Sequence, residues 1–99
     1  MANYYKYYKN HQIIIRVYPN IIRNSDGSLF RASDAGHAMT VTGCIGGDKF
    51  VVSSWNGKYY VYLSDYTKEK LEEHNIKDRE GNSINISKSY IRLEIYRYS

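Results

Sequence analysis

The apolar and polar positions form their clearest pattern between residues 36 and 63. Three short runs rich in Val, Ile, Thr, Tyr and Phe are separated by two glycine-containing turns, Gly46-Gly47-Asp48 and Asn56-Gly57. These turn residues tolerate the positive φ angles that tight hairpin turns require. The pattern therefore predicts three consecutive antiparallel strands, at residues 38–45, 49–55 and 58–63.

Strict alternation predicts one further strand on each side of this region, at residues 12–18 and 90–98. In both segments apolar residues occupy every second position, so that they share one face of a strand. These inward positions are Ile13, Ile15 and Val17 in the first segment and Ile91, Leu93 and Ile95 in the second.

The segments between these strands carry turn and capping residues. Pro19 ends the first strand because proline cannot donate to a strand ladder, and residues 19–36 are expected to be mostly loop. A helix of about two turns is expected within residues 65–75, where Asp65 or Thr67 can cap the start and Asn75 can end it.

The predicted fold class is α+β: a twisted, mostly antiparallel sheet of five to six strands with one short helix. At 99 residues the chain is expected to form a single domain, residues 1–99. Residues 1–10 interleave tyrosine and lysine. Such a segment can stack on bases and contact phosphates, but an edge strand or a frayed end is the favoured interpretation.

Composition narrows the function classes only slightly. Twelve tyrosines and a formal net charge of +4 are compatible with binding to nucleic acid or to an acidic partner and require neither. The single cysteine excludes an intrachain disulfide and fits a reducing compartment. Neither a signal peptide nor a membrane-spanning run is evident, so we expect a cytoplasmic location or delivery into the cytoplasm of a target cell.

Two segments carry a resemblance to a known family. They read Gly-His-Ala-Met-Thr-Val-Thr-Gly from Gly36 and Phe-Val-Val-Ser-Ser-Trp-Asn-Gly from Phe50. Together they resemble the C-terminal, histidine-bearing half of papain-like cysteine peptidases and of related amidases and toxins. The later run Ser-Tyr-Ile-Arg-Leu from Ser89 is similar to a strand that completes the sheet of that family.

The resemblance implies a catalytic site made of His37, Ser53 and Trp55. His37 would be the general base and acid, Ser53 would stand where the family has an orienting asparagine, and Trp55 would shield their contact from water. Counting back from the first glycine turn places His37 opposite about residue 57, and a small register shift or bulge would bring Ser53 within reach.

The nucleophile that this chemistry requires is missing, because the family places its cysteine before the histidine. The sole cysteine, Cys44, is seven residues after His37 on the same predicted strand, about 23 Å away when extended and on the opposite face. An activated pair needs a separation of about 3 Å. The resemblance implies amide hydrolysis, either proteolysis or deamidation, of the toxin or effector type. Because the nucleophile is missing, the chain would be a fragment, a subunit completed by another chain or an inactive relative.

Two other functions remain open. The first is a small metal-independent ribonuclease toxin. The base, cation and hydroxyl groups of such a site could come from His37, Thr40, Thr42, Lys49, Ser53, Lys58 and Tyr59. The second is a small basic binding module, such as an inhibitor, an immunity protein or a phage antagonist, because Tyr and Arg are common at binding hot spots. A protein partner or substrate is expected, RNA is possible but not favoured, and neither a cofactor nor a metal site is expected, because the histidines and Cys44 show no ligand spacing.

Overall fold

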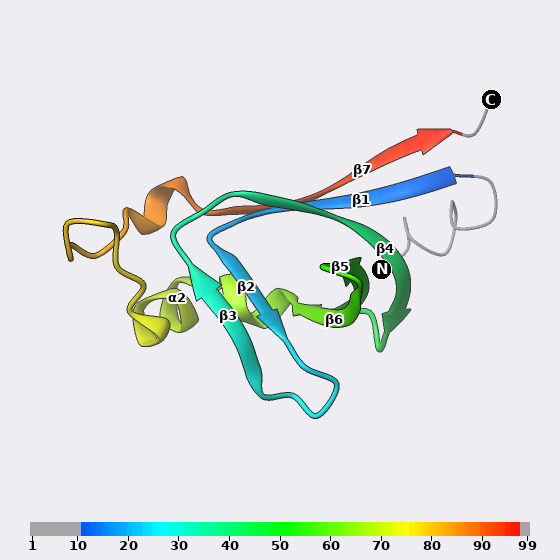
Figure 1. The fold of residues 1–99 in the computed structure, drawn as a ribbon. Helices are drawn as coiled ribbons and strands as arrows, with labels where there is room; N and C mark the ends of the chain where they lie inside the picture. The colour runs from blue at the N-terminus through cyan, green and yellow to red at the C-terminus, as the bar shows by residue number, and fades with distance from the viewer. Residues whose placement is uncertain (1–10, 98–99) are drawn as a thin grey trace.

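In the computed structural model, which describes residues 11–97, seven strands form one antiparallel sheet (Figure 1). Across the sheet the strands follow the order β3-β2-β6-β5-β4-β1-β7. The strands are β1 His11–Tyr18, β2 Asn20–Arg23, β3 Leu29–Ser33, β4 His37–Ile45, β5 Lys49–Ser54, β6 Gly57–Tyr62 and β7 Tyr90–Arg97. One short helix, α2 (Lys68–His74), and two 3-10 turns, η1 (Leu63–Tyr66) and η2 (Ile86–Lys88), complete the structure.

The prediction of an antiparallel sheet with one short helix is confirmed, but its strand number is wrong. Residues 19–36, expected to be mostly loop, contain β2 and β3. In β2 the successive residues Ile21 and Ile22 are both fully buried, because one packs beside α2 and the other faces the main core. Such a strand shows no alternation, so its sequence lacks the period-two signal. The expectations for residues 1–10 lie outside the described residues.

A corner at Pro19 gives the sheet its shape. Strand β1 ends just before this residue and β2 begins just after it, yet the two strands lie at different places in the sheet. Together they pair with β3 and β4 as one long bent hairpin, in which Val17 lies opposite His37 and Asn20 lies opposite Ser33. Figure 1 shows the sharp change of direction between β1 and β2. The bend brings β2 beside β6, so the sheet curls around its core.

The main hydrophobic core lies on the inner face of this curled sheet. The face predicted for β1 is confirmed, since Ile13, Ile15 and Val17 are all buried. The rest of the main core is Ile22, Met39, Val41, Phe50, Val52 and Val61. A second, smaller core of Ile21, Leu71 and Ile76 joins α2 to the outer face of β2.

One of the two predicted hairpin turns lies one residue from its expected position. The β4–β5 turn uses Gly46 and Gly47 at positive φ, as expected. In the β5–β6 turn the central residues are Trp55 and Asn56, with φ of 48° and 59°, and not Asn56 and Gly57. Gly57 instead leaves room for the side chain of Tyr59, because a Cβ at this position would lie 2.9 Å from the Tyr59 ring.

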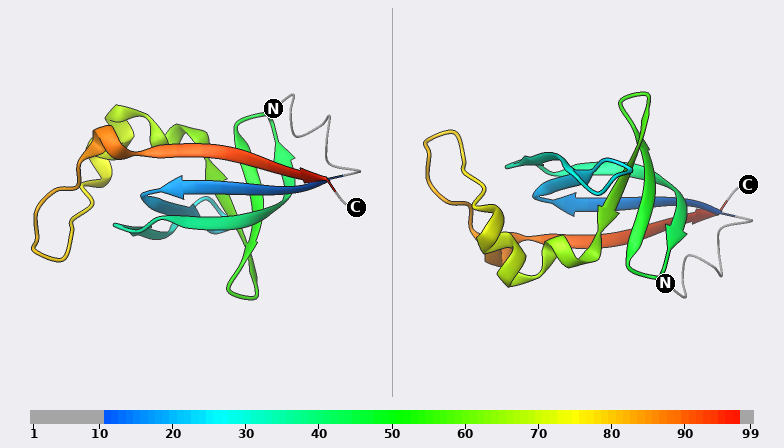
Figure 2. Two further views of the ribbon diagram at one scale, coloured as in Figure 1. Left: turned by 90° about the horizontal axis from the view of Figure 1, so that it is seen from above. Right: turned by 90° about the horizontal axis from the view of Figure 1, so that it is seen from below.

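The helix follows the prediction closely. Thr67, one of the two expected caps, accepts a hydrogen bond from the backbone N–H of Lys70, and Asn75 ends the helix in the left-handed conformation. Figure 2 shows the segment from α2 to η2 gathered at one end of the sheet, away from the end of β7. Within residues 11–97, none of the helices has the length and apolar character needed to cross a membrane.

Candidate functional site

The first residue of β4, His37, lies where the main core opens to solvent. It pairs with Val17, a core residue, and directly opposed residues of an antiparallel pair point to the same face. His37 therefore shares the inner face with Met39 and Val41, but at the strand end, where its side chain is only half-buried.

Two side chains fix the imidazole of His37. Its ring stacks on the indole of Trp55, with centroids 4.8 Å apart and planes 1° from parallel. Its Nε2 atom lies 3.0 Å from the Oγ atom of Ser54. The structure thus brings His37 and Trp55 together as the family resemblance implied, but the hydroxyl beside the imidazole belongs to Ser54 and not to Ser53.

A bulge in β4 decides which serine reaches the histidine. The pairing with β5 shifts between Val41 and Gly43, so that Val41 lies opposite Val52 and Thr40 lies opposite Ser53. Without that shift Ser53 would lie opposite Val41, on the face of His37. The extra residue in a bulge changes the register by one, and a change of one moves each side chain of the facing strand to the other face.

Around Trp55 a cluster of aromatic and cationic side chains covers the open end of the core. The guanidinium carbon of Arg31 lies 4.7 Å from the indole centroid, and Tyr59 meets the indole edge-on at 6.1 Å. Phe30 packs on Tyr59 at 4.5 Å. We call this cluster the aromatic cap; it consists of Phe30, Arg31, His37, Trp55 and Tyr59, from β3, β4, the β5–β6 turn and β6.

The outer side of the aromatic cap is open to solvent. Trp55 is 46% exposed and Phe30 is 42% exposed, whereas Tyr59 is half-buried and packs against the main core. The cap therefore covers one end of the core and also forms an exposed aromatic surface.

The charge state of His37 follows from its surroundings. Burial, with a smaller contribution from the positive charge of Arg31, lowers the pKa of His37 below its ordinary value of 6.5. The Ser54 hydroxyl supplies no charge to oppose this effect. At neutral pH the ring is therefore neutral, and it can accept or donate a hydrogen bond at Ser54 according to its tautomer.

The backbone at Trp55 is held in a conformation that bulky residues rarely adopt. Its φ of 48° lies in the left-handed region, which costs an L-residue other than glycine roughly 1–2 kcal/mol. The stack on His37 and the contact with Arg31 offset that cost. The turn thus presents a large aromatic ring in a fixed position.

Other residues proposed from the sequence do not join His37 in one site. Cys44 lies at the far end of β4, opposite Phe50, and packs against the main core. Thr40, Ser53 and Lys58 lie side by side across β4, β5 and β6, on the face of the sheet opposite to His37. The ribonuclease set is therefore divided between two faces. In the part of the chain that the structure describes, no three His, Cys, Asp or Glu residues are placed to hold a metal ion.

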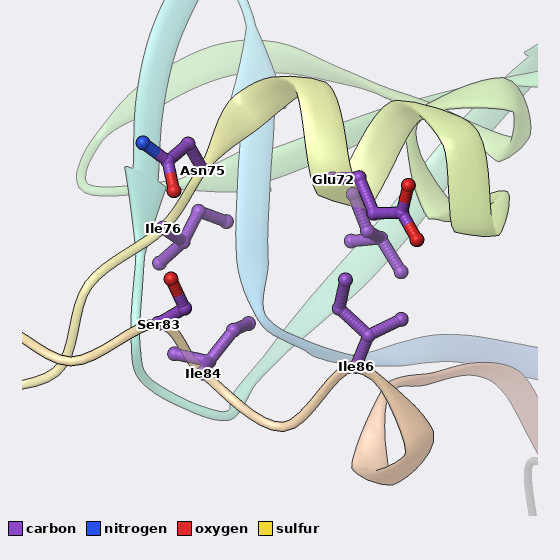
Figure 3. A pocket seen from close by; sticks show the side chains of 7 residues that line it. Glu72, Asn75, Ile76, Ser83, Ile84 and Ile86 are labelled. Carbon is purple, nitrogen blue, oxygen red and sulfur yellow. The ribbon is translucent and has the colours of Figure 1, made fainter.

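Two surface hollows lie away from the aromatic cap. One, of about 190 Å³, lies between α2 and the segment before η2 and is mostly apolar, with Leu71, Ile76, Ile84 and Ile86 among its lining residues (Figure 3). The other is a broad polar depression beside the β3–β4 corner, lined by Asp34, Lys77, Asp78, Arg79 and Glu80. Neither is lined by His37.

A buried ionic network, which the sequence analysis missed, joins β2 to η1 and α2. The side chain of Asp65 is 1% exposed and accepts hydrogen bonds from Nε and Nη2 of Arg23, at 2.8 and 2.6 Å. His74 Nε2 lies 3.0 Å from the same carboxylate. Burial alone would raise the pKa of Asp65, but the hydrogen bonds from Arg23 and His74 outweigh it and hold that pKa below its ordinary value. Because its partners surround it, we assign this network to stability and not to a reaction.

Comparison of the chain with protein-family models, with curated proteins and with solved structures gives no match. The aromatic cap is the candidate functional site, because it combines solvent exposure, side chains held in place by their neighbours, and aromatic and cationic groups.

Proposed function

We propose that this chain is a protein-binding module and that the aromatic cap is its contact surface. The observation that carries the proposal is the exposed Trp55, held between neighbours that fix its position. Trp, Tyr and Arg are the residue types most enriched at binding hot spots, and the cap contains one of each. A surface ordered before binding loses less side-chain entropy when a partner docks.

The exposure and contacts of the cap residues favour a protein partner over a small ligand or RNA. Small-molecule sites bury most of their ligand in a largely apolar pocket, whereas Trp55 and Phe30 are 46% and 42% exposed. A nucleobase needs an open ring face, but His37 and Arg31 already cover part of the indole. A protein surface can instead contact the exposed edges of Trp55 and Phe30 together.

Selection from a phage-displayed library of random linear peptides tests the proposal. Peptides enriched on the wild-type chain should lose about tenfold or more in affinity for Trp55→Ala, as expected for a hot-spot residue. Tyr96→Ala is the matched control, because Tyr96 is an aromatic residue of similar exposure, 50%, on the distant strand β7. Equal affinity for both variants, or no enrichment on the wild-type chain, would contradict the proposal.

The arrangement of His37, Ser54 and Trp55 favours one second candidate, the amide hydrolysis implied by the papain-like resemblance. Ser54 holds Nε2 and Trp55 fixes the ring plane, which are the requirements for a positioned general base. Since Cys44 packs against the core at the far end of β4, a thiol would have to come from another chain. Hydrolysis of a fluorogenic amide should then require an added cysteine-bearing chain and disappear in His37→Ala; activity of the chain alone that survives this substitution would contradict it.

A further inference from the structure

We propose that the free edge of β3 accepts an extended acidic segment of the partner as an added strand, whose side chains then reach the aromatic cap. This inference rests on the protein-binding function proposed above and specifies the chemistry of the partner. Main-chain hydrogen bonds to the edge would supply affinity, and the cap would supply specificity.

Strand β3 is suited to such pairing by its position. It is the last strand of the sheet order, and within residues 11–97 it pairs with β2 alone. Its first three residues are exposed, among them Leu29 at 46% and Phe30 at 42%. An edge strand with exposed apolar side chains is a template for another strand.

The charges on β3 favour an acidic segment. Arg31, the middle residue of the strand, is exposed and makes no ion pair with any carboxylate in the described part of the chain. Its guanidinium carbon lies 4.7 Å from the indole centroid of Trp55, and a guanidinium has five N–H donors that can bind a carboxylate. Strand β3 itself, Leu-Phe-Arg-Ala-Ser, contains no acidic residue.

The same residue disfavours a second copy of this chain as the occupant. If two β3 edges paired about a two-fold axis with Leu29 opposite Ser33, Arg31 would lie directly opposite its own copy. Like charges in directly opposed positions are destabilising. A segment with a glutamate or aspartate at that position would meet a favourable charge instead.

The other edge strand, β7, also carries a cation over an exposed aromatic ring, since the guanidinium carbon of Arg92 lies 5.0 Å from the ring centroid of Tyr90, but β7 contains a carboxylate as well. Along β7 the carboxylate of Glu94 is bonded to the guanidinium of Arg16 and to the hydroxyl of Tyr96. Arg31 differs from Arg92 in two respects: its strand contains no acidic residue, and its guanidinium contacts Trp55, the exposed indole of the aromatic cap.

A titration of the isotope-labelled chain with a synthetic peptide of alternating Glu and Val, followed by amide NMR, tests the inference. Binding should shift the backbone signals of residues 29–33 and the indole N–H of Trp55, the sole tryptophan. A peptide of alternating Lys and Val should produce neither shift. N-methylation of the acidic peptide should weaken binding at every second position only, because alternate amides of an added strand face the protein.

Arg31→Ala should lower the affinity for the acidic peptide by about tenfold, because one charged contact is lost. Lys58→Ala is the control, since it removes the same charge from the opposite face of the sheet and should leave binding unchanged. An indole shift without shifts in residues 29–33, or an N-methylation pattern without the two-residue period, would overturn strand addition and leave the cap as a binding surface. Absence of any shift would also overturn it, whereas the proposed function is judged separately by the peptide selection.

Discussion

Removal of the buried Asp65 carboxylate should destabilise the fold more than removal of an exposed charge. In Asp65→Ala the guanidinium of Arg23 loses two hydrogen bonds, and His74 loses its acceptor. Truncating one partner of a buried ion pair costs about 3–5 kcal/mol, because the remaining charge stays partly desolvated. Arg23 keeps a hydrogen bond to the carbonyl of Gly27 and is 19% exposed, so we expect the lower end, about 3 kcal/mol.

Urea and thermal unfolding followed by the fluorescence of Trp55 would measure this loss. For a domain of this size about 3 kcal/mol corresponds to a fall in Tm of roughly 12–24 °C. Asp65→Asn should lose less stability than Asp65→Ala, because the asparagine amide keeps one acceptor oxygen. Glu73→Ala is the matched control, because the Lys70–Glu73 pair is exposed and should contribute less than about 1 kcal/mol.

The pH dependence gives a second check on the same carboxylate. The folded-state pKa of Asp65 lies below its ordinary value, so its contribution is complete above about pH 3.9, the unfolded value, and is lost as the pH falls through the lower folded value. The stability difference between the wild-type chain and Asp65→Ala should therefore shrink only in that acidic range. A loss below about 1 kcal/mol at neutral pH would refute the reasoning, since it would mean that the buried charges do not depend on one another.

Three further changes test the core, the turn and the histidine. Ile15→Val should cost about 0.5–1.5 kcal/mol in urea unfolding, whereas Ile45→Val, at a position 49% exposed, should cost close to nothing. Gly57→Ala should displace the ring of Tyr59, destabilise the fold by about 1–3 kcal/mol and shift the NMR signal of the Trp55 indole; unchanged spectra would show that the ring needs no such space. Because the folded-state pKa of His37 is lowered, stability should be complete above about pH 6.5 and fall as the pH drops through the lower folded value, and His37→Gln should remove that decline; an unchanged pH profile in the variant would contradict it.

Local sequence signals determined much of the sheet by themselves. Alternation assigned Ile13, Ile15 and Val17 to the core face, since in a strand the side-chain period is fixed by the backbone. The glycines at 46 and 47 fixed the first hairpin turn, because they tolerate positive φ. Thr67 and Asn75 marked the ends of the helix for the same local reason.

Tertiary contacts determined the turn position and the extra strands, for which the local sequence signals conflicted or were absent. Asn56-Gly57 is the better turn sequence, yet the turn is centred on Trp55 and Asn56, because in this register Tyr59 covers Gly57 and Trp55 stacks on His37. Neither β2 nor β3 shows alternation, because β2 is buried on both faces and the first three residues of β3 are all exposed. In each case contacts between distant segments outweighed local propensity.

In the candidate site, too, some features follow from the local sequence and others only from the tertiary structure. The sequence placed His37 and Trp55 together, because both lie near the ends of neighbouring strands. It could not show that Ser54 would replace Ser53, since that depends on a one-residue bulge in β4. Nor could it show Arg31 over the indole, or Arg23 bonded to Asp65, because those pairs form only when the corner at Pro19 brings β2 next to β6, with β3 on the far side of β2. A strand's own sequence sets which face each side chain occupies; its partners are set by register and curvature, which only the folded sheet determines.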